Sequence, residues 1–382
     1  MRWSIFHQWI FSNLANPVAH CYNPLHETFS ESPLGKRITN PFDMREILKR
    51  FAPEFLKWCY RNREDISRLA GTAKKLTKET GICYLALLFD MSVSLLRYPV
   101  IPREYRMFRF YERKHWSRKQ FLTDYRSHKI WKSFVPDHEK YAPMSIDKQV
   151  VYRYFSDFLH RQWLFVPDVS DKQIEDFLCE QKQIIVKSRY HWYGTGIYKL
   201  FYSDVADMQA LCQSLRNEEA ILEEIIQQHP DLNSINPSSI NSLRINTVLD
   251  KKDIPHVLLA NLRMGSGETI IDNFENGGLS AGIDLDTGLI LTPGIKEDLT
   301  IHIKHPTSGV ILPGFQIPHW ETTKEMVLRL ARMAPQMRWA GWDVAITGKG
   351  PLLIEGQQSS AGAVVSQLPT QTGIYHILRS YL

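Results

Sequence analysis

Residues 342–357 read WDVAITGKGPLLIEGQ, and this stretch decides how the C-terminal part of the chain folds. Two apolar runs flank a turn at 347–351 that contains two glycines, which predicts a β-hairpin. The hairpin would bring Asp343 beside Glu355 and Gln357, whose oxygens are hard donors suited to Mg²⁺. The alternative is a surface hairpin with ordinary turn acids. Because Asp343 lies in an apolar strand, where an unpaired charge is costly, we expect it to have a partner.

A second informative stretch lies upstream. Residues 183–187 read QIIVK, an apolar strand that ends in Lys187, and a loop with Gly194 and Gly196 follows. Backbone N–H groups of a glycine loop, together with an ammonium group at its base, can neutralise polyphosphate charge. The loop therefore favours phosphate binding.

Residues 220–227 read AILEEIIQ, which predicts an apolar strand interrupted by Glu223 and Glu224. Adjacent side chains of a strand point to opposite faces. Beside a nucleotide, such a strand can offer backbone groups to the adenine edge. Solvated edge acids explain either glutamate equally well, so this stretch alone decides nothing.

Length and composition set the outer limits. A chain of 382 residues suggests two or three domains, and 43% hydrophobic with 23% charged residues describes a globular protein. The N-terminal sequence lacks the aliphatic run of a secretory signal, and the five cysteines show no C-x-x-C spacing. The apolar stretch 82–101 contains Asp90 and Arg97, so it predicts a buried helix instead of a membrane span. We expect a reducing, cytoplasmic location.

The net charge of +5 hides an asymmetry. Residues 1–140 carry 25 Lys and Arg against 14 Asp and Glu, a net +11, whereas residues 141–382 carry −6. Residues 103–132 alone hold ten cations and eight aromatic residues. This predicts contact with something anionic, such as a membrane surface or a lipid-linked glycan, without requiring nucleic acid. The alternative is an amphipathic helical pair with its cations in solvent.

The pattern along the chain changes near residue 141. A basic, mainly helical domain is expected over 1–140 and a mixed α+β domain over 141–382. Helices are expected at 148–158, 171–180, 204–215 and 322–334. Strands are expected at 183–187, 242–249, 256–263, 289–291, 342–346 and 352–355.

Common nucleotide and hydrolase signatures are absent. The sequence contains no Walker G-x-x-x-x-G-K-[ST], no G-x-G-x-x-G and no G-x-S-x-G. In their place, weaker motifs follow one another in an order that resembles the ATP-grasp superfamily, and specifically the sugar-transfer associated ATP-grasp proteins. The motifs that carry the superfamily resemblance are Asp147-Lys148, 185–187, 223–225, Asp343 and 355–357. The strings particular to the sugar-transfer group are INPSSINSLRINT (235–247), DNFENGGLSAGID (272–284), HPTSG (305–309) and GWDVAITGKGPLLIEG (341–356).

The resemblance covers about residues 100–382 and implies an ATP-grasp fold, in which two α+β subdomains clasp ATP and the lid subdomain spans about 180–228. It implies that Lys148 and Lys187 bind ATP phosphates. It also implies the following further assignments: Gly194 and Gly196 in the phosphate loop, Glu223, Glu224, Ile225 and Ile226 as the adenine hinge, and Asp343, Glu355 and Gln357 as Mg²⁺ ligands.

Arg244 and Arg263 are our candidates for binding the transferred phosphoryl group or acyl phosphate, because a planar guanidinium suits such oxyanions; either could be a structural pair. The candidates for a polar loop near the acceptor are Asn273, Asn276, Gly277 and Gly278, for which the alternative is a plain Asn-Gly turn.

Three features depart from the superfamily pattern. Gln357 stands where Asn is common, and His191, Trp192 and Tyr193 occupy a loop that usually has small residues. The basic first part does not have the pattern of the Rossmann-like domain with which many members begin.

The resemblance implies an ATP-dependent carboxylate-amine ligase that works through an acyl phosphate. By group association, its substrates would be a uronic acid or other sugar of a surface polysaccharide, such as a capsule, and an amino acid or amine, at the inner face of the membrane. A glycan kinase and a non-catalytic nucleotide-binding partner of a glycosyltransferase remain alternatives.

Overall fold

The computed structural model describes residues 53–134, 144, 147–190, 196–267, 272, 274, 277–358 and 362–381. The chain divides into two compact units. The first takes in the chain up to Ser127 together with Thr372–His376, and the second comprises His128–Gln371 and Ile377–Leu382. The domain boundary expected between residues 140 and 141 lies outside the described residues.

The described part of the first unit is helical, as expected. Its elements are α4 (Pro53–Arg61), α5 (Arg63–Ser67), α6 (Leu69–Thr80), α7 (Tyr84–Arg97), α8 (Pro102–Met107), the 3-10 turn η3 (Phe110–Glu112), α9 (His115–Arg118) and the start of α10 (Asp124–Phe134). The apolar stretch 82–101 forms α7, a helix whose Asp90 is paired with Arg118 at 2.6 Å between Oδ2 and Nη2. Among the described residues, no helix combines the length and apolarity that crossing a bilayer requires.

Two glycines of this unit, Gly71 and Gly81, have different places in α6. Gly81 caps α6 in the left-handed conformation, at φ 72°. Gly71 lies inside α6, where a Cβ would meet nothing within 4 Å. An exposed glycine costs a helix only about 1 kcal/mol relative to alanine, so the flanking turns carry the helix through it.

The basic segment 103–132 folds into several short helices that bury four of its eight aromatic residues. Tyr105 and Phe108 are enclosed, whereas Trp116 is 63% exposed. Arg118 is also buried and paired with Asp90. This arrangement agrees with the alternative of amphipathic helices whose cations face solvent, although the segment is not a simple helical pair.

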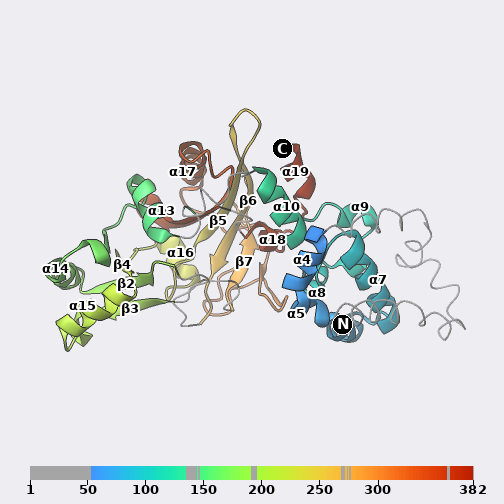
Figure 1. Cartoon of the computed structure of the whole chain (residues 1–382), viewed down its shortest axis with the longest axis horizontal. Helices are drawn as coiled ribbons and strands as arrows, with labels where there is room; N and C mark the ends of the chain where they lie inside the picture. The colour runs from blue at the N-terminus through green and yellow to red at the C-terminus, as the bar shows by residue number, and fades with distance from the viewer. Residues whose placement is uncertain are drawn as a thin grey trace, which may run out of the picture. The chain divides into compact units, whose positions relative to one another are not determined.

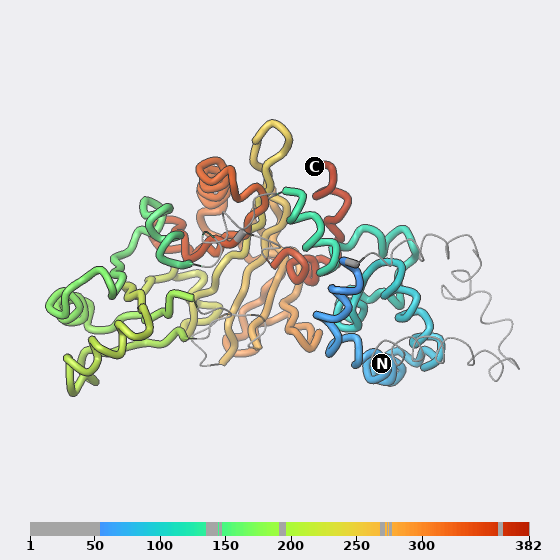
Figure 2. Tube along the Cα trace, viewed as in Figure 1, coloured from blue at the N-terminus to red at the C-terminus, as the bar shows by residue number. Residues whose placement is uncertain are grey.

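The second unit contains two antiparallel sheets (Figure 1). A four-stranded sheet has the order β1-β4-β2-β3, formed by β1 (Trp163–Phe165), β2 (Gln183–Ser188), β3 (Ile197–Phe201) and β4 (Ala220–Glu224). A seven-stranded sheet has the order β11-β10-β5-β6-β7-β8-β9, formed by β5 (Leu243–Leu249), β6 (Pro255–Met264), β7 (Leu279–Gly282), β8 (Gly294–Ile295), β9 (Ile301–His302), β10 (Trp339–Thr347) and β11 (Gly350–Gln358). Figure 2 traces the four-stranded sheet in green, apart from the yellow-to-red strands of the larger sheet.

The helices of this unit lie between and after the strands. They are α13 (Lys148–Tyr154), η4 (Ser156–Phe158), η5 (Val166–Asp168), α14 (Asp171–Gln181), η6 (Tyr202–Asp204), α15 (Met208–Asn217), α16 (Pro230–Ile235), α17 (Trp320–Met333), α18 (Ala363–Ser366) and most of α19 (Tyr375–Ser380).

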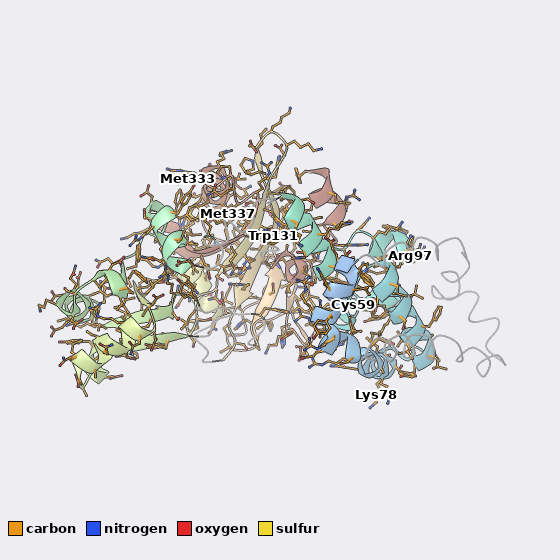
Figure 3. All side chains as sticks on the ribbon, in the orientation of Figure 1. Cys59, Lys78, Arg97, Trp131, Met333 and Met337 are labelled. Carbon is orange, nitrogen blue, oxygen red and sulfur yellow. The ribbon has the colours of Figure 1, made fainter. Side chains whose placement is uncertain are left out.

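Each sheet has its own apolar core. One face of the four-stranded sheet packs on α14 and α15 around residues such as Ile184, Val186 and Leu222. One face of the seven-stranded sheet packs on α17, whose apolar stripe joins the larger core. At the end of α17, Met333 is 37% exposed whereas the nearby Met337 is 1% exposed (Figure 3).

The hairpin expected from 342–357 is confirmed. β10 and β11 pair antiparallel from Thr347↔Gly350 at the turn to Asp343↔Glu355, with a bulge after Asp343. The other expected strands and helices are also found with boundaries shifted by a few residues, except 289–291. There Leu289 and Ile290 form only isolated bridges, because Gly288 and Pro293 interrupt a run too short to pair along its length.

Candidate active site

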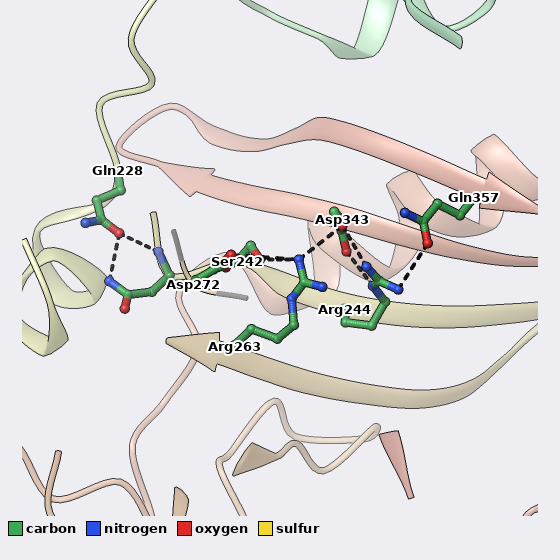
Figure 4. Close-up of polar contacts among 8 residues, drawn as sticks. Gln228, Ser242, Arg244, Arg263, Asp272, Asp343 and Gln357 are labelled. Carbon is green, nitrogen blue, oxygen red and sulfur yellow. Dashed lines mark hydrogen bonds and ion pairs between the residues drawn. The ribbon is translucent and has the colours of Figure 1, made fainter. Parts of the chain in front are cut away.

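Polar side chains cross one face of the seven-stranded sheet, on the side opposite the α17 core. Asp343 on β10 pairs in register with Glu355 on β11 and with Arg244 on β5, and Arg244 pairs with Asn261 on β6. Directly paired residues point to the same face. Figure 4 shows several of these groups approaching one another. The residues of this polar face are Ser242, Arg244, Asn261, Arg263, Ser280, Asp343, Glu355 and Gln357.

The expected partner of Asp343 is present, and it is a pair of arginines. Arg244 donates from Nη2 to Oδ2 of Asp343 at 2.8 Å and from Nε to Oδ1 at 2.5 Å, and Arg263 donates from Nη2 to Oδ2 at 3.1 Å. Burial acts to raise the pKa of Asp343, but the two guanidinium groups outweigh it and hold the pKa below its ordinary value. Asp343 is thus ionised, and both its oxygens are engaged.

Glu355 and Gln357 lie two residues apart on β11, on the same face as Asp343. The Oε1 of Gln357 lies 3.4 Å from Nη1 of Arg244. Burial raises the pKa of Glu355 in spite of the positive charges of Lys148 and other nearby cations. Within the described part of the chain, the carboxyl group of Glu355 makes no side-chain hydrogen bond. Its oxygens therefore remain available as ligands.

Asp272 belongs to this cluster but was not singled out from the sequence. Its Oδ2 accepts hydrogen bonds from the backbone N of Ser242, at 3.0 Å, and from the Ser242 hydroxyl. Its Oδ1 lies 3.9 Å from Nη2 of Arg263. Asp272 is the first residue of the string DNFENGG, but a single Asp before an Asn-Gly turn carries no signal that it would reach a strand thirty residues away.

The four-stranded sheet contributes a second buried polar cluster. Lys187 on β2 lies 2.9 Å from Oε1 of Glu223 on the adjacent strand β4. Nε of Arg161 lies 3.0 Å from the other oxygen, Oε2, and the hydroxyl of Tyr152 donates to Oε1. Burial would raise the pKa of Glu223, but Arg161 and Lys187 lower it to about 2.

Lys148 begins α13, where Asp147 caps the helix by accepting from the backbone N of Gln149 at 3.0 Å. Burial lowers the pKa of Lys148, and the negative charge of Glu355 opposes that effect. The positive charge of Lys187 lowers the pKa of Lys148 further. The structure therefore brings together both candidate phosphate lysines and one candidate metal ligand, from three elements far apart in the sequence.

The candidate adenine hinge follows β4. The side chain of Glu224 points away from Glu223 and accepts from the backbone N of Gln162 at 3.0 Å. β4 ends at Glu224, so Ile225 and Ile226 are half-buried residues outside the strand. Gln228 then forms a bridge with Thr347, which attaches the segment to the end of β10. Both glutamate side chains thus have protein partners.

Several candidates fall outside the described residues. These are His191, Trp192, Tyr193, Gly194, Asn273 and Asn276. Gly196 is described and has φ 70°, and Gly277 has φ 85°, a region of backbone conformation that favours glycine. Gly278 is also described and follows Gly277 into β7.

The donor set fits a hard cation together with an oxyanion. Two carboxylates and an amide oxygen share one sheet face, with two arginines beside them and two lysines near Glu355. Among the described residues, no group of three or more His, Cys, Asp and Glu side chains is placed to hold a metal. A cation at this face would therefore share its coordination with Gln357 and with oxygens from outside the protein.

Comparisons with solved structures find matches of low identity and low TM-score. D-cycloserine synthetase DcsG is 12% identical, with a TM-score of 0.37 over 72% of this chain and 94% of that chain. D-alanyl-alanine synthetase A from Vibrio cholerae is 11% identical, with a TM-score of 0.39 over 63% of this chain and 66% of that chain. The ADP complex of purK, N5-carboxyaminoimidazole ribonucleotide synthetase, is 9% identical, with a TM-score of 0.33 over 56% of this chain; the match spans less than half, 45%, of that chain.

None of the curated proteins matches the sequence. A family model does match, namely sugar-transfer associated ATP-grasp, over residues 198–381. The matched residues include β4, the seven-stranded sheet and the polar face with Arg244, Asp343 and Glu355. Residues 198–381, just under half of this chain, are thus similar to the sugar-transfer associated ATP-grasp family.

Proposed function

We propose that this protein is an ATP-dependent carboxylate-amine ligase that joins an amino acid or amine to a uronic acid or other carboxylate-bearing sugar of a surface polysaccharide. The observation that carries the proposal is the polar face, where acidic oxygens for a cation and two arginines for an oxyanion lie within hydrogen-bonding distance of one another. Such a combination suits phosphoryl transfer, in which positioning and charge neutralisation supply most of the rate.

In the proposed reaction, an oxygen of the substrate carboxylate attacks the γ-phosphorus of ATP, and the bond to the β-phosphate oxygen breaks to release ADP. The amine nitrogen then attacks the acyl carbon of the resulting acyl phosphate. The bond to phosphate breaks, the nitrogen loses a proton and an amide remains. Activation is needed because a carboxylate by itself is inert to amines.

The roles of individual residues follow from their chemistry. Lys148 and Lys187 would hold the nucleotide phosphates, and the backbone at Ile225 and Ile226 would meet the adenine edge. Arg244 and Arg263 would bind the transferred phosphoryl group, because a guanidinium matches the geometry of an oxyanion.

Asp343, Glu355 and Gln357 would hold Mg²⁺, which when bound neutralises charge on the phosphates. Because both oxygens of Asp343 accept hydrogen bonds from arginines, we expect a cation that binds Asp343 to exchange with at least one guanidinium. That exchange would free an arginine at the point where the transferred phosphoryl group has to be bound.

The products decide between this proposal and its rivals. Purified protein would be incubated with ATP, Mg²⁺, a panel of amino acids and uronic-acid oligosaccharides, and the products read by mass spectrometry. The ligase predicts ADP, inorganic phosphate and an adduct with the mass of an amide. A sugar that gains the mass of a phosphate group would identify a kinase, and no ADP across the panel would point to a non-catalytic nucleotide-binding protein.

We also infer that the basic first part meets an anionic partner, either a membrane surface or a lipid-linked glycan. The support is its net charge of +11 over residues 1–140 and the exposed Trp116 within the basic segment 103–132. Co-sedimentation with vesicles containing anionic lipid should fall steeply with salt. No binding at low salt would exclude the membrane and leave the glycan.

A further inference from the structure

The buried cluster on the four-stranded sheet is more elaborate than a phosphate lysine requires. Tyr152, Arg161, Lys187 and Glu223 form a closed set of hydrogen bonds and ion pairs. The side chains of Arg161 and Glu223 are each only 2% exposed, whereas that of Lys187 is 10% exposed. Within the cluster, then, the ammonium group of Lys187 is the charged group most open to a ligand.

Charges in this cluster do not balance. Arg161 and Lys187 each carry +1 and Glu223 carries −1, and the nearby charges of Lys148 and Glu355 are of opposite sign, so the ionised groups sum to +1. If Arg161 were absent, Glu223 and Lys187 would form a closed neutral pair. A buried net charge is costly unless an anion is near, so the presence of Arg161 points to a ligand of negative charge.

Arg161 also reaches the strand that carries the candidate metal ligands. Its Nη1 donates to the carbonyl oxygen of Leu353 on β11 at 2.7 Å, two residues before Glu355. The Nη2 group lies 3.1 Å from the hydroxyl of Tyr152 on α13. One guanidinium therefore fixes Glu223, Tyr152 and β11 relative to each other.

We propose that Arg161 is a positioning residue that cancels the charge of Glu223, so that Lys187 keeps an uncompensated positive charge for a nucleoside di- or triphosphate. The inference rests on the proposed function, since it assumes that Lys187 faces phosphates. Arg161 itself is too enclosed to touch the nucleotide. Glu223, whose two oxygens are both engaged, acts here through Lys187 and contributes no side-chain contact to adenine.

The test measures ADP binding by calorimetry in Mg²⁺-free buffer with EDTA. Without Mg²⁺, the candidate metal site does not contribute to the measured affinity. Arg161→Met should weaken ADP binding about tenfold or more, because Glu223 then neutralises Lys187. The double variant Arg161→Met/Glu223→Gln restores the net charge of +1 and should recover affinity to within about threefold of wild type. Arg161→Lys keeps the charge and should lose less than Arg161→Met.

Arg153→Met is the matched control, because Arg153 lies nearby on α13 in an exposed ion pair with Asp168. This variant should bind ADP with wild-type affinity. A double variant that binds no better than Arg161→Met would overturn the proposal, since a merely structural role is made worse by a second loss. If Arg161→Met fails to fold, the double variant decides: affinity within about threefold of wild type supports the proposal, and a loss of about tenfold or more overturns it. A wild-type protein that binds no ADP either in this buffer or with Mg²⁺ added refutes the proposed function itself.

Discussion

At the scale of single residues, Asp343 combines two tasks that the sequence could only suggest separately. It was expected to bind Mg²⁺ and also to need a partner inside an apolar strand. The structure supplies Arg244 and Arg263 as partners, the same residues that were candidates for the transferred group. The carboxylate and the two arginines therefore form one buried ionic cluster, and we expect binding of a cation there to compete with the arginines for the oxygens of Asp343.

Replacing Asp343 by Asn should affect both stability and turnover. Arg244 and Arg263 would lose a buried counter-charge, which we expect to cost about 3 kcal/mol of unfolding free energy. Mg²⁺-dependent release of ADP should fall at least about a hundredfold, a loss of about 3 kcal/mol of transition-state stabilisation. Urea denaturation and a coupled ADP assay measure the two effects.

The control for this variant is Asp253→Asn, because Asp253 pairs with Arg338 at the surface and should change stability by less than about 1 kcal/mol. If Asp343→Asn turns over at the wild-type rate, Asp343 is not a metal ligand. Its role would then be limited to its ion pairs with Arg244 and Arg263.

The lowered pKa of Glu223 predicts how the stability of the fold depends on pH. Its pKa in the folded protein is about 2, below the ordinary value of 4.5, so its ionised form stabilises the fold above pH 4.5. That contribution is lost as the pH falls from about 5 to about 2. Glu223→Gln should therefore be less stable than wild type at pH 7, with the difference shrinking towards pH 2. Urea unfolding at a series of pH values measures this, and parallel curves for the two proteins would contradict the assignment.

At the scale of elements, the β10–β11 hairpin determines whether Asp343 and Glu355 face each other. Its register is set at the turn, where Thr347 pairs with Gly350, and shifts by one residue at the bulge after Asp343, which places Asp343 opposite Glu355. Gly350 has φ 123°, a conformation that residues with a Cβ rarely adopt. The backbone at this turn therefore controls the spacing of the metal candidates.

Gly350→Ala should lower the unfolding free energy by about 1–2 kcal/mol, because alanine is strained at that φ. Gly348→Ala is the matched control in the same turn, since Gly348 has no such φ and open space around its Cα. Thermal denaturation of the two variants measures the difference. Equal melting temperatures would mean that the turn relaxes without cost and does not fix the register.

At the scale of the whole molecule, the first unit contains a short segment from near the C-terminus of the chain. Thr372–His376 belongs to the first unit, where the backbone N of Tyr375 donates to the carbonyl oxygen of Gln120 at 2.8 Å. A Cβ on Gly373 would lie 2.4–2.6 Å from backbone atoms of Gln120 and Phe121. This close approach requires glycine at position 373.

Gly373→Val should accordingly loosen the first unit from its C-terminal segment. We expect faster amide hydrogen exchange across residues 115–126, by about tenfold or more, because a backbone clash cannot be relieved by a side-chain rotation. Exchange in α15, on the four-stranded sheet, serves as the internal reference and should not change. Unaltered exchange over 115–126 would show that the segment is not needed for the first unit.

The features that could be predicted from the sequence are local and periodic. The hairpin of 342–357, the strands that contain Lys187 and Glu224 and the helix α17 follow from apolar runs, helical spacing and glycine turns, and the order of the motifs indicated the family. Which charged side chains pair with one another could be seen only in the folded chain. The pairing of Asp343 with Arg244 and Arg263, the contribution of Asp272 and the ties from Arg161 to Glu223 and Leu353 join residues up to about a hundred and ninety positions apart. Ion pairs have no periodic signature in a sequence, because they depend on which strands become neighbours and which faces are buried.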